Sequence, residues 1–236
     1  MSRSLIVTID GPAGTGKSSA AAQVAERLGF DMLDTGAMYR AVALLALEAG
    51  IGPADGALIA AAIDRSTLQV DFSVQPPVIR LDGRDVHLRI RDHDVTAIVS
   101  QVASHRDVRL RMVEAQRQVA LTHAKLVTEG RDQGTVVFPD AVVRIWLDAR
   151  PEVRAHRRAD ELRAQGIEVD DAVVLRDIAN RDASDRGRAE GPLRQPIGAS
   201  VVDTSDLSFA QVVDRLEAII RESLAAAKIG CGGVSA

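Results

Sequence analysis

Residues 11–18 read Gly-Pro-Ala-Gly-Thr-Gly-Lys-Ser, and this stretch decides the fold class. It fits the pattern G-x-x-x-x-G-K-[ST] of phosphate-binding loops. A β-branched run at 5–9 precedes it and a helical stretch at 17–28 follows it, which is the context that the pattern requires. Glycines let successive backbone N–H groups turn toward phosphate oxygens, and the start of the helix adds its positive dipole end. The sequence therefore predicts a phosphate site between a strand and a helix.

Two side chains of this loop have separate expected tasks. The Lys17 ammonium would reach the β- and γ-phosphates of a nucleotide, and the Ser18 hydroxyl would ligate Mg²⁺. The alternative is a glycine-rich turn without chemical importance, and the strand and helix on either side disfavour it. Nucleotide binding is predicted for nine residues: Gly11, Pro12, Ala13, Gly14, Thr15, Gly16, Lys17, Ser18 and Ser19.

Strand and helix patterns alternate along the rest of the chain, which favours a three-layer α/β fold around a largely parallel sheet. Period-two alternation with Pro-Pro and Asp-Gly turns at 67–90 predicts an antiparallel insert. The charged segment 151–190 predicts one or two exposed helices joined near Gly166. The other predicted strands are 31–34, 126–130, 141–149 and 200–204, and the other predicted helices are 37–49, 107–123 and 208 to about 228.

The composition is that of an ordinary soluble domain. The chain has 236 residues, with 29 basic and 33 acidic side chains and a net charge of −4. This charge balance disfavours a protein that binds nucleic acid mainly through the phosphates of its backbone. Cys231 is the only cysteine, which excludes an intrachain disulfide framework, and no apolar stretch approaches the ~18 residues of a membrane span. We expect a cytoplasmic protein with one domain over 1–230 and a disordered tail at 231–236.

Other proteins that carry such a loop can be tested against the rest of the chain. A GTPase needs a guanine-reading Asn/Thr-Lys-x-Asp segment, and neither Lys125, followed by Leu-Val, nor Lys228, followed by Ile-Gly, fits. A motor-type ATPase usually has Asp-Glu after an apolar strand, whereas Asp148 here is followed by Ala149. Asp148 is better explained as the end of its strand. The loop alone does not name the reaction.

Two further clusters follow predicted strands, and ligands of such folds bind beyond the carboxyl ends of the strands. In the first, 33–40, a helix cap explains Asp-Thr-Gly but leaves Arg40 unexplained, and near a phosphate loop Arg40 suggests a second anion. In the second, 129–135, a turn explains the two glycines. Arg131 and Asp132, between two apolar strands, favour a ligand site.

A third cluster lies in the charged segment near the C-terminal end of the chain. Arg181, Asp185 and Arg188 have spacings of four and three, which predicts that they share one helical face. The alternative is a solvated helix with ion pairs between successive turns. Because the chain also has a phosphate loop, the interpretation that this basic face binds phosphates is favoured.

The segments that carry this chemistry resemble those of bacterial cytidylate kinases in order and spacing. They are IDGPAGTGK (9–17), LDTGAMYRA (33–41), SQVA (100–103), EGRDQGTVVFPDA (129–141) and NRDASDRGR (180–188). The resemblance covers about 4–225. It implies a P-loop kinase fold with a central parallel sheet, a small antiparallel β insert at about 65–100 and a mobile helical lid at about 151–190.

The same resemblance implies a reaction: the γ-phosphoryl group of ATP passes, with Mg²⁺, to the 5′-phosphate of CMP or dCMP. It implies small-molecule substrates. We expect a monomer because no long apolar stripe is left unassigned, and the charge balance and the lack of a long apolar stretch disfavour nucleic-acid and membrane partners. In this family the matching positions bind the monophosphate (Thr35, Arg40, Arg131, Arg181), read the cytosine edge (Ser100, Arg109, Asp132) and contact the sugar (Asp185). The implied catalytic set is Lys17, Arg131, Arg181 and Arg188.

Two departures from the family pattern and two rival functions stay open at this point. Gln133 stands where the family usually has an apolar residue, and Gly198 where it usually has Asp, which puts the anchor between lid and last strand in question. A P-loop kinase for another small acceptor, such as shikimate, is one rival, and a nucleotide-binding module without catalysis is the other. Ser100, Arg109 and Asp132 favour a pyrimidine acceptor, because a carboxylate and a guanidinium can pair with the edge of cytosine.

Overall fold

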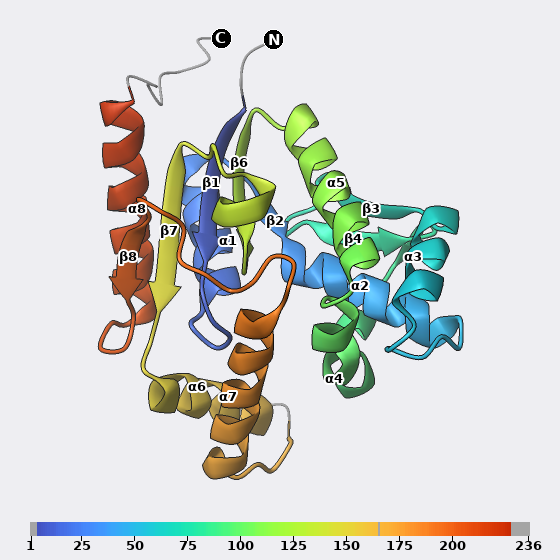
Figure 1. Cartoon of the computed structure of the whole chain (residues 1–236). Coiled ribbons are helices and arrows are strands. Elements are labelled where there is room, and N and C mark those ends of the chain that lie inside the picture. The colour runs from blue at the N-terminus through green and yellow to red at the C-terminus, as the bar shows by residue number, and fades with distance from the viewer. Residues whose placement is uncertain (1–3, 165, 228–236) are drawn as a thin grey trace.

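A five-stranded parallel sheet forms the centre of the molecule (Figure 1). The computed structural model describes residues 4–164 and 166–227, so the predicted tail at 231–236 and the predicted helix end at Lys228 lie outside the described residues. Every neighbouring pair of strands in this sheet is parallel, as predicted. In spatial order the strands are β2 (Asp31–Asp34), β6 (Lys125–Gly130), β1 (Leu5–Asp10), β7 (Val143–Asp148) and β8 (Ser200–Asp203).

Helices cover both faces of the sheet, which confirms the three-layer architecture. Successive side chains of a strand point to opposite faces, and Leu126 and Val127 of β6 accordingly belong to two separate apolar cores. One core is closed by α1 (Lys17–Leu28) and α8 (Phe209–Ala226). The other is closed by α2 (Thr35–Glu48), α3 (Gly56–Arg65), α4 (His93–Val102) and α5 (Arg106–Thr122).

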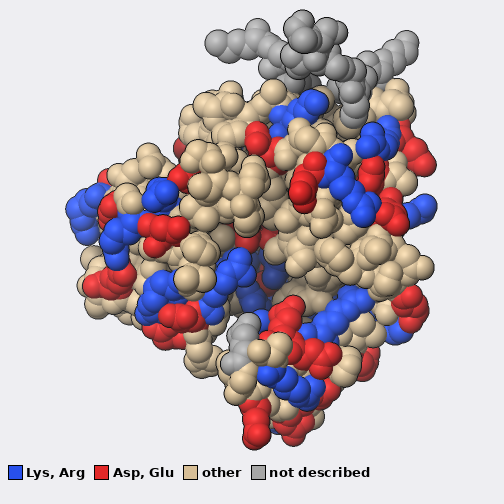
Figure 2. All heavy atoms as spheres, turned by 180° about the vertical axis from the view of Figure 1, so that it is seen from behind, with Lys and Arg blue, Asp and Glu red and all other residues tan. Residues whose placement is uncertain are grey.

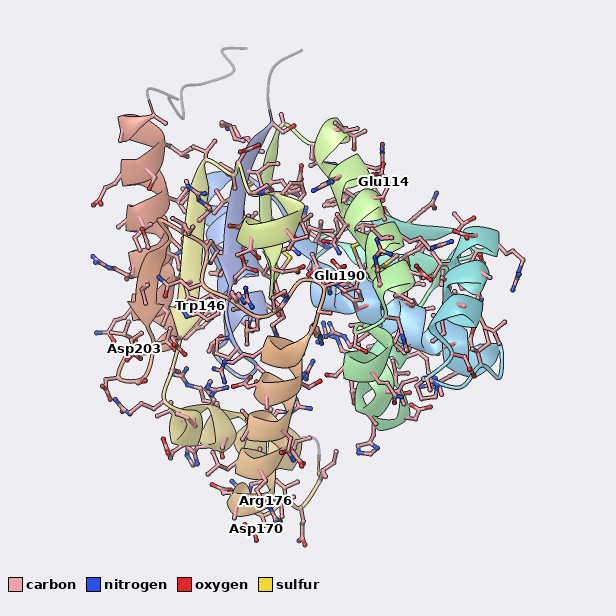
Figure 3. The ribbon with its side chains drawn as sticks, viewed as in Figure 1. Glu114, Trp146, Asp170, Arg176, Glu190 and Asp203 are labelled. Atoms are coloured by element: carbon pink, nitrogen blue, oxygen red, sulfur yellow. The ribbon has the colours of Figure 1, made fainter. Side chains whose placement is uncertain are left out.

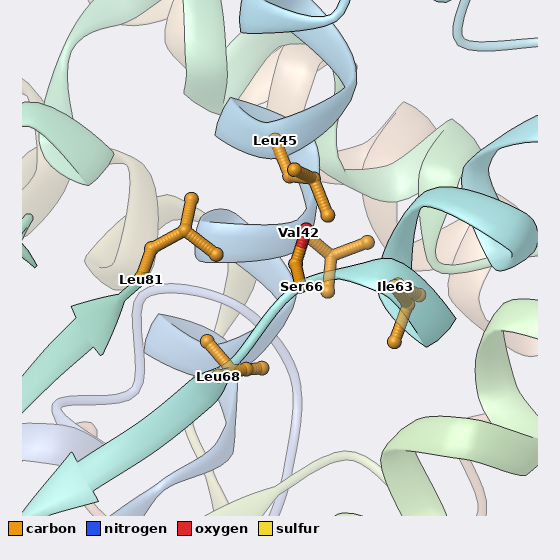
Figure 4. A pocket seen from close by; sticks show the side chains of 6 residues that line it. All are labelled: Val42, Leu45, Ile63, Ser66, Leu68 and Leu81. Atoms are coloured by element: carbon orange, nitrogen blue, oxygen red, sulfur yellow. The ribbon is translucent and has the colours of Figure 1, made fainter. Parts of the chain in front are cut away.

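The antiparallel insert is confirmed as a small three-stranded sheet that packs against α2, but its strands lie within 68–85 and the last part of the predicted segment 65–100 belongs to helix α4. Its strands are β3 (Leu68–Asp71), β4 (Val78–Leu81) and β5 (Arg84–Asp85), and a single helical turn, η1 (Arg89–Arg91), follows. A cavity of about 10 Å³ separates the insert from α2 and α3 (Figure 4). A cavity of this size holds at most about one water molecule. The lining residues are Val42, Leu45, Ile63, Ser66, Leu68 and Leu81.

A hairpin of two helices, α6 (Pro151–Ala164) and α7 (Asp171–Gly187), projects from the sheet at the lower end of Figure 1. It has a small apolar core of its own, made by Ala155, Ala159, Val174 and Ile178, which is separate from the two cores of the body. One prediction for this segment is wrong. Arg188 does not continue the helical face, because α7 ends at Gly187 and Arg188 has extended backbone angles (φ −61, ψ 137).

The register of the sheet brings the functional loops to one edge. Asp10, at the end of β1, pairs with Gly130 of β6, and Asp34, at the end of β2, pairs with Glu129. The phosphate loop, the start of α2 and the segment after β6 therefore begin side by side. Within the described residues, no helix combines the length and the apolar character that crossing a membrane requires.

Candidate active site

The phosphate loop connects β1 to α1 and places a buried lysine at the start of the helix. The Lys17 ammonium donates hydrogen bonds to the Pro12 carbonyl (2.6 Å) and to the Thr15 hydroxyl (3.3 Å). Burial lowers the pKa of Lys17, and the positive charge of Arg131 lowers it further. A phosphate at this point would relieve both effects, because it supplies the negative charge that the loop lacks.

Ser18 follows Lys17 and is exposed at the helix start, where its hydroxyl donates to Glu129 Oε1 (2.7 Å). Burial raises the pKa of Glu129, and the nearby carboxylate of Asp34 raises it further. Sequence reasoning gave Glu129 no role. Its position as the last but one residue of an apolar strand was the available signal, since a buried acid there needs a partner. The neighbouring Ser19, predicted to bind nucleotide, is exposed as well.

The start of α2 forms the next part of the site. Asp34 caps the helix by accepting a hydrogen bond from Ala37 N–H (2.7 Å), so the capping explanation holds for Asp34. Thr35 is buried and donates instead to the Glu129 carbonyl (2.7 Å), which ties α2 to β6. Arg40 lies one turn along and donates to Asp34 Oδ2 (3.2 Å), while its buried Nε has no partner. Arg40 thus keeps donor capacity that capping does not use.

The segment after β6 is held in place by Asp10. Both carboxylate oxygens of Asp10 accept backbone hydrogen bonds, from Gln133 N–H (2.8 Å) and from Gly134 N–H (2.7 Å). Burial raises the pKa of Asp10 to about 7, although these two hydrogen bonds oppose the rise. They shape the short turn of π-helix, η2 (Gln133–Val137), that follows Asp132. Asp10 was not predicted, because its role exists only once β1 and β6 are adjacent.

The two residues singled out in that segment point to different partners. Asp132 is buried and forms an ion pair with Arg109 of α5, and the Arg109 guanidinium lies 5.6 Å from the centre of the Tyr39 ring. Arg131 turns toward the hairpin, where its Nε donates to Asp185 Oδ2 (2.9 Å). The structure therefore joins Arg109 to Asp132 and Arg131 to Asp185.

The hairpin adds the last cations of the site. Asp185 is buried and accepts from Arg131 through one oxygen and from Arg188 through the other. Burial and the positive charge of Arg131 lower the pKa of Arg181 to about 10, and Arg40 and Arg188 act in the same direction. The buried Nε atoms of Arg181 and Arg188 have no hydrogen-bond partner. The structure thus brings Lys17, Arg40, Arg131, Arg181 and Arg188 close enough to repel one another.

The surface around this cluster is hollowed. Seen from behind, a depression separates the body of the molecule from the α6–α7 hairpin, and Lys and Arg side chains gather at its rim (Figure 2). Ser100, predicted to read the base, lies half-buried on α4, and its hydroxyl has no hydrogen-bond partner among the described residues. It is the one predicted base-reading residue outside the Arg109–Asp132 pair.

The two departures from the family pattern lie in different surroundings. Gln133 is fully buried, but its side chain accepts from Thr128 (2.8 Å) and donates to Gln116 (3.1 Å), so its polar atoms are satisfied. Gly198 lies in an exposed turn, and the nearest atom to a Cβ at this position would be Arg144 Nη2 at 3.8 Å. This arginine belongs to β7, so the position lies beside the core sheet.

Comparisons of the sequence with known proteins show the family of the chain. The sequence model of the cytidylate kinase family matches residues 7–222. A cytidylate kinase of Mycolicibacterium paratuberculosis is 47% identical over 222 residues, covering 94% of this chain and 97% of that protein. The cytidylate kinases of Nocardia farcinica and Shouchella clausii are 44% and 41% identical, and the matches cover 93% and 94% of this chain and 95% and 98% of those proteins. The chain belongs to the cytidylate kinase family.

Proposed function

We propose that this kinase transfers the γ-phosphoryl group of ATP to the 5′-phosphate of CMP or dCMP. The observation that carries the proposal is the placement of the Arg109–Asp132 pair beside a cluster of cations at the phosphate loop, in which Arg181 is repelled by Arg131, Arg40 and Arg188, and Lys17 by Arg131 and Arg181. Repulsion among buried cations is relieved by anions, and two phosphorylated substrates supply them. The carboxylate and guanidinium of the pair offer the hydrogen bonds that a cytosine edge needs.

The transfer breaks the bond between the γ-phosphorus and the oxygen that bridges it to the β-phosphate, and forms a bond to an oxygen of the CMP phosphate. ADP leaves with the bridging oxygen. The migrating group spreads negative charge over its three equatorial oxygens, so the reaction needs positioned cations more than a base. We assign this role to the Lys17 ammonium and to Arg131, Arg181 and Arg188, because the guanidinium forks of the three arginines suit phosphate oxygens.

The acceptor phosphate is assigned to Thr35, Arg40, Arg131 and Arg181. Support comes from the unpartnered Nε atoms of Arg40 and Arg181, which are buried donors without an acceptor. Asp185 is assigned a contact with the sugar, and the structure adds a second task for it. Because it accepts from Arg131 and Arg188 at once, it also fixes the directions of these two arginines.

The residues beside Ser18 fit a magnesium ion. The Ser18 hydroxyl and the Glu129 carboxylate are hard oxygen donors 2.7 Å apart. The carboxylate of Asp34 lies near enough to raise the pKa of Glu129. Mg²⁺ is usually held by one or two protein groups together with substrate phosphates and waters. The bound ion would neutralise charge on the β- and γ-phosphates. Ser18 would hold it, and Glu129 and Asp34 would orient its waters.

The function is tested by measuring ADP release from Mg-ATP with CMP, dCMP, UMP, AMP and shikimate offered separately at equal concentration. Strong stimulation by CMP and dCMP alone supports the proposal. Equal or stronger stimulation by another acceptor would identify a kinase of different specificity. ATP binding without stimulation by any acceptor would identify a nucleotide-binding module. The monomeric state and the cytoplasmic location stay predictions, and sedimentation of the purified chain checks the first.

The assigned cations are tested with two arginines of the same helix. Arg181 lies in the buried cluster, whereas Arg176 is exposed near the far end of the hairpin, beside Asp170 and away from the sheet (Figure 3). We expect Arg181→Ala to lower kcat/KM for CMP by at least 100-fold and Arg176→Ala to leave it within threefold of wild type. Equal effects of the two changes would contradict the assignment of Arg181.

A further inference from the structure

A buried ion pair joins the two helices of the hairpin. Arg154 of α6 donates from Nη1 to Asp182 Oδ2 of α7 at 2.7 Å. The two side chains are only 5% and 3% exposed, unlike the other ion pairs between α6 and α7, which lie on the surface. The proposed reaction assigns no role to either residue. A fully buried pair contributes little to stability compared with apolar packing, so a different role has to be considered.

The same two side chains also form hydrogen bonds with the main chain of the phosphate loop. Arg154 Nη1 also donates to the Ala13 carbonyl (3.0 Å), and Asp182 Oδ1 accepts from Ala13 N–H at 3.4 Å. Arg154 Nε donates to the carbonyl of Ala149, just beyond the end of β7 (3.0 Å). The pair thus connects α6, α7, the phosphate loop and the end of a core strand through polar contacts alone.

A glycine of the loop makes this approach possible. Gly14 has a φ of 77, and a Cβ at this position would lie 3.2 Å from both the Cβ and the carbonyl oxygen of Arg154. That distance is tighter than nine in ten real Cβ contacts. The fourth residue of the phosphate-loop motif is therefore packed directly against α6. This contact is independent of the ion pair and shows that the hairpin is fitted to the loop.

The position of α7 matters because Arg181 is the neighbour of Asp182. The apolar core of the hairpin is separate from the cores of the body, so apolar packing does not fix the hairpin over the loop. Polar contacts between the hairpin and the body must supply this alignment. We propose that the Arg154–Asp182 pair is a positioning link that clamps the hairpin to Ala13 and thereby holds Arg181 at the transferring phosphates. This inference rests on the proposed kinase function.

The first test replaces Asp182 by asparagine, which keeps the shape of the side chain and removes its charge. We expect kcat with CMP to fall at least tenfold while the dissociation constant for ATP changes less than threefold, because the loop itself is held by Lys17 and Thr15. The rate of ADP release without acceptor should rise relative to kcat, since a loose hairpin admits water. The matched control is Asp171→Asn, which breaks the exposed pair between Asp171 and Arg163 on the same two helices and should leave all three quantities unchanged.

A second variant separates positioning from folding. The double change Arg154→Met with Asp182→Leu replaces the buried pair by apolar groups, which commonly preserves stability. We expect this variant to melt within a few degrees of wild type and still to lose kcat at least tenfold. The single change Arg154→Lys leaves Asp182 in place and keeps a cation that can reach it. This variant should therefore have a higher kcat than the double variant. A double variant with kcat within threefold of wild type would overturn the proposal.

Hydrogen exchange tests the link without any turnover. Amides of α6 and α7 should exchange faster in the double variant, while those of the parallel sheet and α8 keep their wild-type rates. Unchanged exchange in the hairpin would overturn the link even if turnover is altered. If wild type itself shows no turnover with CMP, the proposed function fails, and the exchange result still decides whether the link exists.

Discussion

Gly191 offers a test of base recognition in which neither Arg109 nor Asp132 is itself replaced. It lies three residues after Arg188 with a φ of 59, and a Cβ there would be 2.1 Å from Arg109 Nη2 and 2.3 Å from Asp132 Oδ2. Ordinary contact requires at least 3.4 Å, so Gly191→Ala must push the guanidinium or the carboxylate away by about 1 Å or more. The added methyl group would separate the pair that we assign to cytosine.

The size of the effect follows from the bonds at risk. A hydrogen bond to a charged group is worth about 1.5–3 kcal/mol, which corresponds to a loss of about 10- to 150-fold in kcat/KM for CMP. The left-handed backbone adds a folding cost of about 1–2 kcal/mol for any residue with a Cβ. Gly50 is the matched control, because its φ is 65 and nothing lies within 4 Å of a Cβ at that position.

The assay compares kcat/KM for CMP, the dissociation constant for ATP and the melting temperature of both variants. We expect similar melting temperatures for Gly191→Ala and Gly50→Ala, unchanged ATP binding in both, and loss of kcat/KM for CMP only in the first. If Gly191→Ala keeps kcat/KM within threefold of the control, the Arg109–Asp132 pair does not read the base in the way the structure indicates.

Four other outcomes are expected. Lys17→Ala should abolish turnover, measured as ADP release with CMP, through loss of phosphate stabilisation. Asp132→Ala should equalise kcat/KM for CMP and UMP. Burial raises the pKa of Asp132, so selection of CMP should weaken as pH falls, at a higher pH than an exposed aspartate would protonate, and Asp132→Asn should remove this pH dependence. Asp10→Asn should lower the unfolding free energy by about 1–3 kcal/mol, measured in urea, because an amide nitrogen would face the N–H of Gln133 or Gly134.

The parallel core was predictable because its strands are short apolar runs, and α1 and β2 have the predicted bounds. The helices α3 and α4 were not predicted. The first is a short alanine-rich run of ten residues, and the second contains Val, Thr and Ile, which have low helix propensity. Both become helices through packing on the core that contains α2, which a local pattern cannot reveal. The helical position predicted for Arg188 was wrong for a related reason. Its spacing fits a helix, but periodicity does not show where a helix ends.

Some residues of the site could be predicted from the sequence, and others could not. Lys17, Arg40 and Arg131 could be found because each is a cation where local structure has no use for one. Arg154 and Asp182 could not, because a charged helix on the surface and a charged helix buried against a loop have the same sequence pattern. Asp10 looks like the ordinary end of a strand, and Gly191 like an ordinary turn glycine, until the fold places them against Gln133 and Arg109.

The buried charges explain why this edge of the sheet is a site and not merely a packed corner. Burial moves the pKa of the acids Asp10 and Glu129 upward and that of the bases Lys17 and Arg181 downward, so each group is held in surroundings that oppose its charge. A fold selected only for stability would replace such groups by apolar ones. Phosphates bound among the bases would reverse the penalty on the cations, and a magnesium ion held at Ser18 would reverse the penalty on Glu129. Backbone hydrogen bonds from Gln133 and Gly134 offset part of the penalty on Asp10. The same substrate complex would therefore satisfy the cations and Glu129 at once.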